Sequence, residues 1–237
     1  MDRTITILAV SRLGNELCVA GVDESGNWIR PTSLSEGWGQ FYKVDIYNKN
    51  NSPVIALSNV VTIRLIHQIP QIGTPHIEDW EYERSCKPVL VGKLNDSQRL
   101  HLFQKISEQS LDSLIESHER SLCLIEPSSI ISANFANISY KGKYQPILNF
   151  TFQNKQYSYK VTDIYWRALG RDLLAKGHSS VLKGKELQSI LQYSKSFLTI
   201  GLGRKFKEKY WPFIVGVHTV SNCINFQAHR QLLRLFV

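Results

Sequence analysis

Short apolar segments, separated by turn residues, fill the first third of this chain. Residues 17–22 and 27–30 flank the turn-forming stretch Asp-Glu-Ser-Gly-Asn at 23–27, so we expect them to form a β-hairpin. Pro31 has no backbone N–H and is expected to end that ladder. Further strands are expected at residues 5–10, 43–47 and 59–66. Together these segments predict an all-β region, with strands short enough for a small barrel.

The hydrophobic period becomes helical after Asn95. Asn-Asp-Ser-Gln at 95–98 is typical of a helix cap, and apolar residues then recur at helical spacing as far as residue 117, with a break near Ser110. These residues are Leu100, Phe103, Ile106, Leu111, Leu114 and Ile115. The sequence therefore predicts a helical connector over residues 95–120.

Strand patterns resume beyond the connector and are interrupted by one further helix. That helix is expected at residues 163–176 and is ended by Gly177; the residues that share its apolar face are Ile164, Ala168, Leu169 and Leu173. Strands are expected at residues 121–125, 128–135, 143–152, 155–161, 197–202 and 211–220, with a tight turn at 153–154. The predicted fold is mainly β with helical insertions. It divides into an N-terminal β-domain at 1–94, the connector at 95–120 and a C-terminal β-domain at 121–237, and the sequence shows no strong internal repeat.

Membrane association is not expected. The chain has 237 residues, of which 43% are hydrophobic, enough for one large domain or two smaller ones. No apolar run reaches the roughly 18–20 residues that span a bilayer. The apolar stretch at residues 4–10 is too short for a targeting signal. We expect a cytoplasmic protein.

Motifs for catalysis and metal binding are missing from the sequence. The four cysteines form no CxxC pair, the seven histidines form no HxH or HExxH pair, and there is no GxSxG elbow. The carboxylates of the acidic run at 78–83 point in alternating directions on an extended segment, so we expect a solvated face there and not a divalent-ion site. We predict a protein without cofactor, metal or enzymatic activity.

Charge is divided unequally along the chain. Residues 1–140 carry 12 Lys and Arg against 16 Asp and Glu, whereas residues 141–237 carry 16 against 4. The basic part also holds 15 of the 25 aromatic residues. Cations interleaved with aromatic rings are typical of a surface that holds phosphates and stacks bases. The alternative is a β-rich domain whose aromatic residues form the core and whose lysines are solvated.

The richest local cluster lies at residues 201–211, Gly-Leu-Gly-Arg-Lys-Phe-Lys-Glu-Lys-Tyr-Trp. Glycines allow close backbone approach and the cations create a positive field, so we predict phosphate contact here. The alternative is a solvated hairpin loop. The residues expected to bind are Arg204, Lys205, Lys207, Lys209, Tyr210 and Trp211, and Lys183 and Lys185 form a second basic loop with the same two interpretations.

Trp28 and Arg30 alternate with Ile29, so on a strand they share one face. If that face is open, a guanidinium and an indole can hold a phosphate and a base. The alternative is that Trp28 belongs to the barrel core and Arg30 pairs with a carboxylate.

Several of these stretches together resemble the dual OB-containing domain family of bacteria and phages. They are Ile-Leu-Ala-Val-Ser-Arg at 7–12, Cys-Val-Ala-Gly at 18–21, Gly-Asn-Trp-Ile-Arg-Pro at 26–31, His-Ile-Glu-Asp-Trp at 76–80, Val-Thr-Asp at 161–163 and Phe-Leu-Thr-Ile-Gly-Leu-Gly at 197–203. The resemblance implies two tandem OB-like barrels, nucleic-acid binding and a mobile-element or defence setting. It adds Arg12, which ends the first stretch, to the expected binding residues. Where the family has a Pro-Glu-Asn-like motif, residues 75–78 read Pro-His-Ile-Glu.

The sequence therefore predicts a protein that binds nucleic acid, single-stranded DNA or RNA, with little sequence specificity. The alternative is an adaptor or regulatory subunit whose acidic N-terminal half docks a protein partner such as an ATPase or a nuclease. Hydrolysis of nucleic acid requires a divalent-ion site that the sequence does not display.

Overall fold

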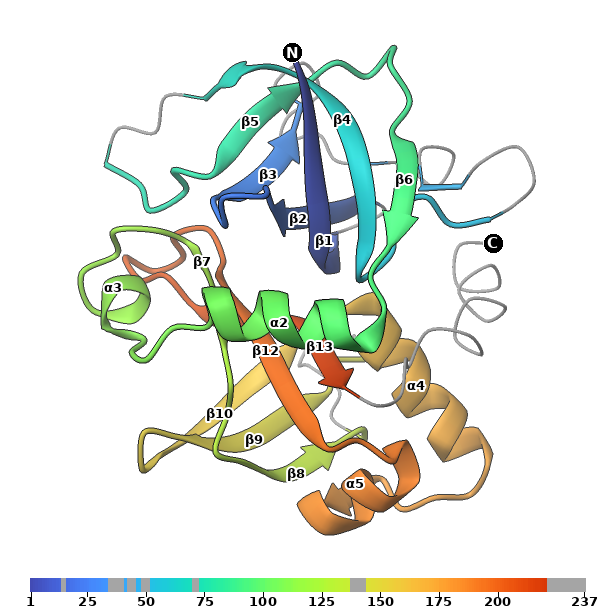
Figure 1. The fold of residues 1–237 in the computed structure, drawn as a ribbon. Helices are drawn as coiled ribbons and strands as arrows, with labels where there is room; N and C mark the ends of the chain where they lie inside the picture. The colour runs from blue at the N-terminus through green and yellow to red at the C-terminus, as the bar shows by residue number, and fades with distance from the viewer. Residues whose placement is uncertain are drawn as a thin grey trace. The chain divides into compact units, whose positions relative to one another are not determined.

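The computed structural model describes residues 1–13, 16–33, 41, 46–47, 52–69, 73–136 and 144–220. It divides into two compact units, each described separately below (Figure 1). The first unit comprises Met1–Ile106 and Asp112–Leu122, and the second comprises Ser107–Leu111 and Cys123–Val237. The predicted domain boundaries at residues 94 and 120 stay a prediction.

The first unit is built around a closed five-stranded barrel. Its strands are β1 (Asp2–Leu13), β2 (Glu16–Val22), β3 (Trp28–Thr32), β4 (Asn59–Gln68) and β5 (Asp79–Tyr82), with β6 (Val89–Lys93) as a sixth strand. The order is β1-β2-β3-β5-β4, and β4 pairs back to β1, which closes the barrel; β6 is added to β4. The β3–β5 pair is parallel and the other pairs are antiparallel.

Alternation of side chains explains the core of this barrel. In β4, Val61, Ile63 and Leu65 are buried, whereas Arg64 and Ile66 are exposed. Inward-facing aliphatic residues of neighbouring strands therefore meet inside the barrel, and burial of each stabilises it by about 1.5–3 kcal/mol.

The predicted β2–β3 hairpin is confirmed. The Asp23 carboxylate accepts hydrogen bonds from the backbone N–H groups of Ser25 and Asn27, and Gly26 has a φ of +91°, which suits a residue without a side chain. The ladder with β2 already ends at Ile29, opposite Gly21, because the N–H of Arg30 donates to the carbonyl of Glu78, so the expectation that Pro31 ends it is wrong. The strand itself continues, because Pro31 lies opposite Trp80 in the parallel ladder with β5. The strand expected at 43–47 lies largely outside the described residues, and the one at 59–66 is β4.

Two helices follow β6, as the change of period predicts. They are α2 (Asp96–Ile106) and α3 (Asp112–Ile115), separated near the expected break. The N–H of Gln98 donates to the Asn95 side-chain oxygen, and the Gln98 side chain accepts from the N–H of Asn95. This reciprocal cap fixes the start of α2.

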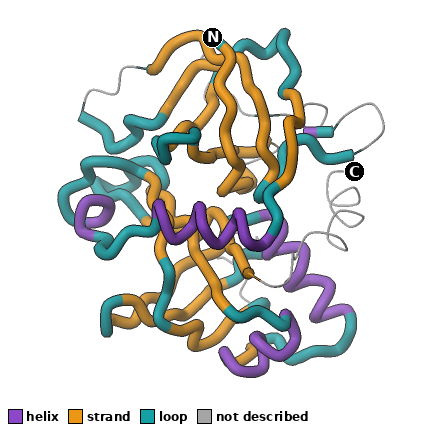
Figure 2. Tube along the Cα trace, in the orientation of Figure 1, coloured by secondary structure: helices purple, strands orange, loops and turns teal. Residues whose placement is uncertain are grey.

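The second unit has a seven-stranded sheet with helices between its strands. Its elements are β7 (Leu122–Ile125), β8 (Ser129–Asn134), β9 (Ile147–Phe152), β10 (Lys155–Val161), α4 (Ile164–Ala175), β11 (Val181–Lys183), α5 (Gly184–Leu191), β12 (Lys195–Leu202) and β13 (Pro212–Val220). The order is β11-β8-β9-β10-β13-β12-β7, and β10 and β13 are parallel. Figure 2 shows the helices as insertions between strands.

The two units repeat one topology. Strands β7 and β8 are consecutive in the chain and lie at opposite ends of the order β8-β9-β10-β13-β12-β7, so the chain itself joins those ends. If β7 and β8 are counted as one broken first strand, the order matches that of the first barrel, including a parallel pair between the third and fifth strands. The expected fold, mainly β with helical insertions and tandem small barrels, is confirmed, and the two units share a strand order that no strong sequence repeat indicates.

The long helix of the second unit begins where the sequence predicts. Asp163 caps α4 by accepting hydrogen bonds from the N–H groups of Tyr165 and Trp166, and its other oxygen accepts from the N–H of Val217 in β13. One buried carboxylate therefore joins the start of α4 to β13. Within the described residues, no helix is both long and apolar enough to cross a membrane.

Candidate functional site

The loop between β12 and β13, residues 203–211, is a defined hairpin. Its first N–H donates to its last carbonyl at 2.9 Å. Nearer the tip, Phe206 and Lys209 exchange backbone hydrogen bonds of 2.8 and 3.3 Å. Lys207 and Glu208 between them have φ values of 50° and 59°, the left-handed pair that forms a tight two-residue turn. We call residues 203–211 the cationic hairpin.

Most of the charge on the cationic hairpin faces solvent. Arg204, Lys205, Lys207 and Lys209 are all exposed. The Glu208 carboxylate lies 2.6 Å from the Lys205 ammonium and raises the pKa of Lys205 through that hydrogen bond. One carboxylate thus offsets one of the four cations, and the hairpin keeps a net charge of +3.

Two aromatic rings project from the same hairpin. Phe206 is 59% exposed and Trp211 is 49% exposed. The Trp211 indole N–H donates to the carbonyl of Phe206 at 3.2 Å, which orients the indole, and the Lys207 ammonium lies 5.8 Å from the centre of the Phe206 ring. Tyr210 is half-buried. Phe206 is missing from the predicted binding residues, although its position between two lysines is a signal that the sequence carries.

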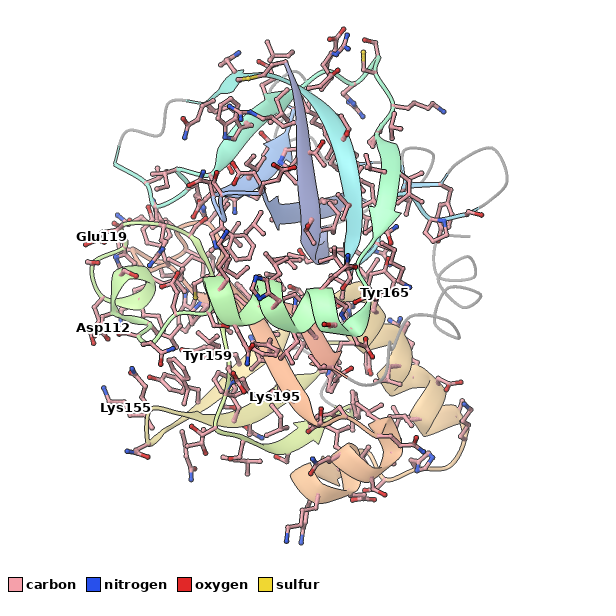
Figure 3. All side chains as sticks on the ribbon, viewed as in Figure 1. Asp112, Glu119, Lys155, Tyr159, Tyr165 and Lys195 are labelled. Atoms are coloured by element: carbon pink, nitrogen blue, oxygen red, sulfur yellow. The ribbon has the colours of Figure 1, made fainter. Side chains whose placement is uncertain are left out.

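Strand β10 borders the hairpin through its parallel ladder with β13, in which Lys160 lies opposite Phe213. The exposed side of β10 bears Gln156, Ser158 and Lys160, and Lys155 stands at the start of the strand (Figure 3). In barrel order, β9 and β10 are the second and third strands and the hairpin joins the fourth and fifth. A polar strand face and a cationic hairpin therefore adjoin each other in this unit.

Several aromatic residues of strands β9 and β10 and of helix α4 pack within the second unit. Phe150, Phe152 and Trp166 are buried, and the rings of Tyr157 and Tyr159 lie 5.4 and 5.6 Å from that of Phe150. Burial raises the pKa of Tyr159. The interpretation of these rings as a base-stacking surface is wrong for the three buried residues. The exposed rings are Phe206 and Trp211 of the hairpin.

Tyr144 is likewise engaged within the unit. Its ring lies 4.6 Å from the Arg171 guanidinium and 5.9 Å from that of Arg167. Burial raises the pKa of Tyr144 to about 12, although both arginines lower it. Gly170 lies beneath, where an added Cβ would be 2.4 Å from the Tyr144 hydroxyl and 2.1 Å from the ring of buried Phe135. The glycine is therefore required by close packing.

Trp28 and Arg30 share one face of β3, as predicted, and Ile29 points into the core. Arg30 forms an ion pair with Asp79 of β5, and the two side chains are only 11% and 8% exposed. This ion pair is the alternative that the sequence left open for Arg30, pairing with a carboxylate. Trp28 is half-buried, and Arg12 is half-buried near the end of β1, opposite Leu17.

The acidic run at 78–83 is not the solvated face that we expected. Besides Asp79, Glu78 is buried. Its carboxylate accepts hydrogen bonds from the N–H and hydroxyl of Ser121, at 2.8 and 2.9 Å, and from the N–H of Leu122, at 3.0 Å. Glu78 thereby anchors the segment Asp112–Leu122 to the first barrel. The sequence gives no local signal of this contact, because the partners lie more than 40 positions apart.

Lys183 and Lys185 lie on a different part of the second unit. Lys183 is in β11, opposite Ser132 of β8, and Lys185 is in α5; both are exposed. Gly184 between them is needed for packing, since a Cβ there would lie 1.9 Å from the carbonyl oxygen of Ile130. Three strands separate β11 from β13 in the sheet order, so no ladder joins this pair to the cationic hairpin.

Comparisons with known proteins identify a family and include a distant structural likeness. The sequence model of the dual OB-containing domain family matches residues 3–217. No curated protein sequence matches the chain. Among solved structures, the chain is similar to the HINa domain of Ifi202 in complex with a 20-base-pair double-stranded DNA, at 11% identity over 90% of each chain and a TM-score of 0.33.

Proposed function

Since the chain belongs to the dual OB-containing domain family, we propose that it binds nucleic acid, with the cationic hairpin of the second unit as the principal contact. The observation that carries this proposal is the pairing of four exposed cations with two exposed aromatic rings on one rigid hairpin. OB barrels bind oligonucleotides across their second and third strands and with the loop between strands four and five. The cationic hairpin occupies that loop position.

Each part of the hairpin has a distinct role in this proposal. Arg204, Lys207 and Lys209 contact phosphates, which releases condensed counterions and makes affinity depend on salt. Phe206 and Trp211 stack on bases, and a stacked base contributes about 1–3 kcal/mol. Stacking requires the faces of bases to be accessible, so we propose a preference for single strands over duplexes, with little sequence specificity. Phosphates and base faces are common to DNA and RNA, and both are proposed ligands.

Fluorescence-anisotropy titrations test the proposal directly. Labelled single-stranded DNA, single-stranded RNA and duplex DNA are titrated with the full chain at several salt concentrations. The variant R204Q/K205Q/K207Q/K209Q removes the hairpin cations. Its control, K87Q/K93Q/K105Q/K176Q, removes four lysines elsewhere and changes the net charge equally.

We expect the hairpin variant to lose affinity steeply and to flatten the salt dependence. Each lost phosphate contact removes about 0.7 from the log–log slope for single strands, so three contacts remove roughly 2. The control should retain most of its affinity. Equal losses in both variants would mean that net charge alone drives binding, and unchanged binding in the hairpin variant would refute the proposed contact.

A protein-docking role is the second candidate function, and the aliphatic edge strand β6 of the first unit favours it. In that role the acidic first part of the chain holds a partner, and an ATPase or nuclease is the kind of partner we propose. A protein that co-purifies with this chain in stoichiometric amount, and remains bound after nuclease treatment, would support it. Capture that disappears with nuclease would refute it.

A further inference from the structure

The first barrel carries an exposed aliphatic edge strand. Within the part of the chain that the structure describes, β6 pairs with β4 and with no other strand. Val89, Leu90 and Val91 are 60%, 41% and 61% exposed, so aliphatic side chains face solvent on both sides of this strand. We propose that the outer edge of β6 adds an extended segment of a partner protein, one with an aliphatic centre and acidic flanks. This inference deepens the protein-docking role proposed above and does not depend on nucleic-acid binding.

An open strand edge offers backbone N–H and C=O groups to another strand, and strand addition is a common mode of peptide recognition. Natural edges are usually protected by charges or proline. In this chain Lys87 and Pro88 precede the strand and Lys93 is its last residue, and a β-bulge lies at Val91, because Val60 of β4 is opposite Gly92 and Val61 is opposite Leu90. The three aliphatic residues between them remain uncovered, so a partner strand would gain both hydrogen bonds and apolar burial.

The flanking lysines decide what kind of strand fits. A second copy of β6 paired antiparallel would bring the Lys87 end of each strand to the Lys93 end of the other, so lysines would meet at both ends. Like charges opposite one another destabilise a pair of strands. Carboxylates three residues on either side of an aliphatic centre would instead meet both lysines.

The test uses a fluorescein-labelled peptide, Glu-Ser-Val-Ile-Val-Ser-Glu, and a control in which both glutamates are lysines. Anisotropy is measured with the full chain and with the variant K87E/K93E, whose two changes lie at exposed positions. A third peptide carries N-methyl groups on its three central residues, which removes their donors and leaves the side chains in place. Binding of single-stranded DNA by K87E/K93E is measured in parallel.

We expect the acidic peptide to bind at least tenfold more tightly than the lysine peptide, and the order to reverse in K87E/K93E. The N-methylated peptide should lose binding, because main-chain pairing is required. Equal binding of both peptides, an unchanged order in K87E/K93E, or full binding by the N-methylated peptide would each overturn the proposal. A dimer in sedimentation that Val91→Asp dissociates would assign the edge to a second copy and also overturn it. We expect K87E/K93E to bind single-stranded DNA as the wild type does, so that a change in peptide binding reports on β6 and not on the cationic hairpin.

Discussion

Replacement of Glu78 by alanine is expected to destabilise the first unit severely. The carboxylate is buried and accepts three hydrogen bonds, from the N–H and hydroxyl of Ser121 and the N–H of Leu122. Each buried donor left without an acceptor costs about 1–3 kcal/mol. Water entering the space left by the side chain would recover part of that cost. We therefore expect E78A to lower the free energy of unfolding by about 3–5 kcal/mol, near the upper end for single substitutions.

The glutamine variant is the matched control. In E78Q the amide oxygen can take the place of Oε1, which accepts from the N–H groups of both Ser121 and Leu122. The amide nitrogen then faces the Ser121 hydroxyl, which accepts as well as donates. Only the charge assistance is lost, so we expect E78Q to cost about 1 kcal/mol.

Urea unfolding followed by far-UV circular dichroism measures both variants against the wild type. The midpoint should fall strongly in E78A and slightly in E78Q, with the slope of the transition unchanged. A cost below 1 kcal/mol for E78A would show that the three hydrogen bonds contribute little. Equal costs for the two variants would show that the charge, and not the acceptor geometry, stabilises the Asp112–Leu122 segment.

Three further outcomes are expected. Phe206→Ala should weaken single-strand binding by about 5- to 100-fold without changing the salt slope, because it removes a stacking ring and no charge; a changed slope in anisotropy titrations would contradict this. Gly170→Ala should lower the free energy of unfolding by about 1–3 kcal/mol, since its Cβ would meet the buried Phe135 ring at 2.1 Å; an unchanged thermal midpoint would contradict the packing argument. Burial raises the pKa of Asp163 to about 7, although the backbone N–H groups of Val217, Trp166 and Tyr165 lower it. Between about pH 4, the usual pKa of an aspartate, and about pH 7, Asp163 is deprotonated in the unfolded chain but protonated in the folded chain. Over that range the contribution of Asp163 to stability falls by about 1.4 kcal/mol per pH unit, and above it the contribution is constant. The variant Asp163→Asn does not titrate at this position. The free energy of unfolding of the wild type in urea, relative to that of this variant, should therefore fall by roughly 2–3 kcal/mol from pH 5 to pH 8. A constant difference would refute the assignment.

Elements with local signals were predictable from the sequence. The turn at 23–27 is recognisable because Asp23 and Gly26 stabilise it within five residues. The start of α2 follows from Asn95 and Gln98, and β10 occupies the expected residues 155–161. Strands β5 and β6 were not predicted. Asp79 in β5 is a charged residue buried by a distant ion pair, and β6 is exposed on both faces, so neither strand shows alternation.

The same distinction applies to the candidate site. The cationic hairpin was recognisable because its glycine, cations and rings are adjacent in the chain. Arg30 was ambiguous because its partner, Asp79, is 49 positions away and reaches it only through the parallel β3–β5 ladder. The aromatic rings of β9 and β10 were ambiguous because composition does not distinguish an inward ring from an outward one. Which face is covered is decided by pairing between strands that are distant in the sequence.

The chain's path through its two units limits how the protein can be divided or recombined. It leaves the first unit after Ile106, returns at Asp112 and leaves again after Leu122. A fragment ending at Ile106 keeps Glu78 but lacks the Ser121 and Leu122 donors that its buried carboxylate requires. A fragment beginning at Cys123 lacks Ser107 and Glu108, which pair with Leu124. A single genetic crossover therefore cannot exchange either unit together with all of its own contacts.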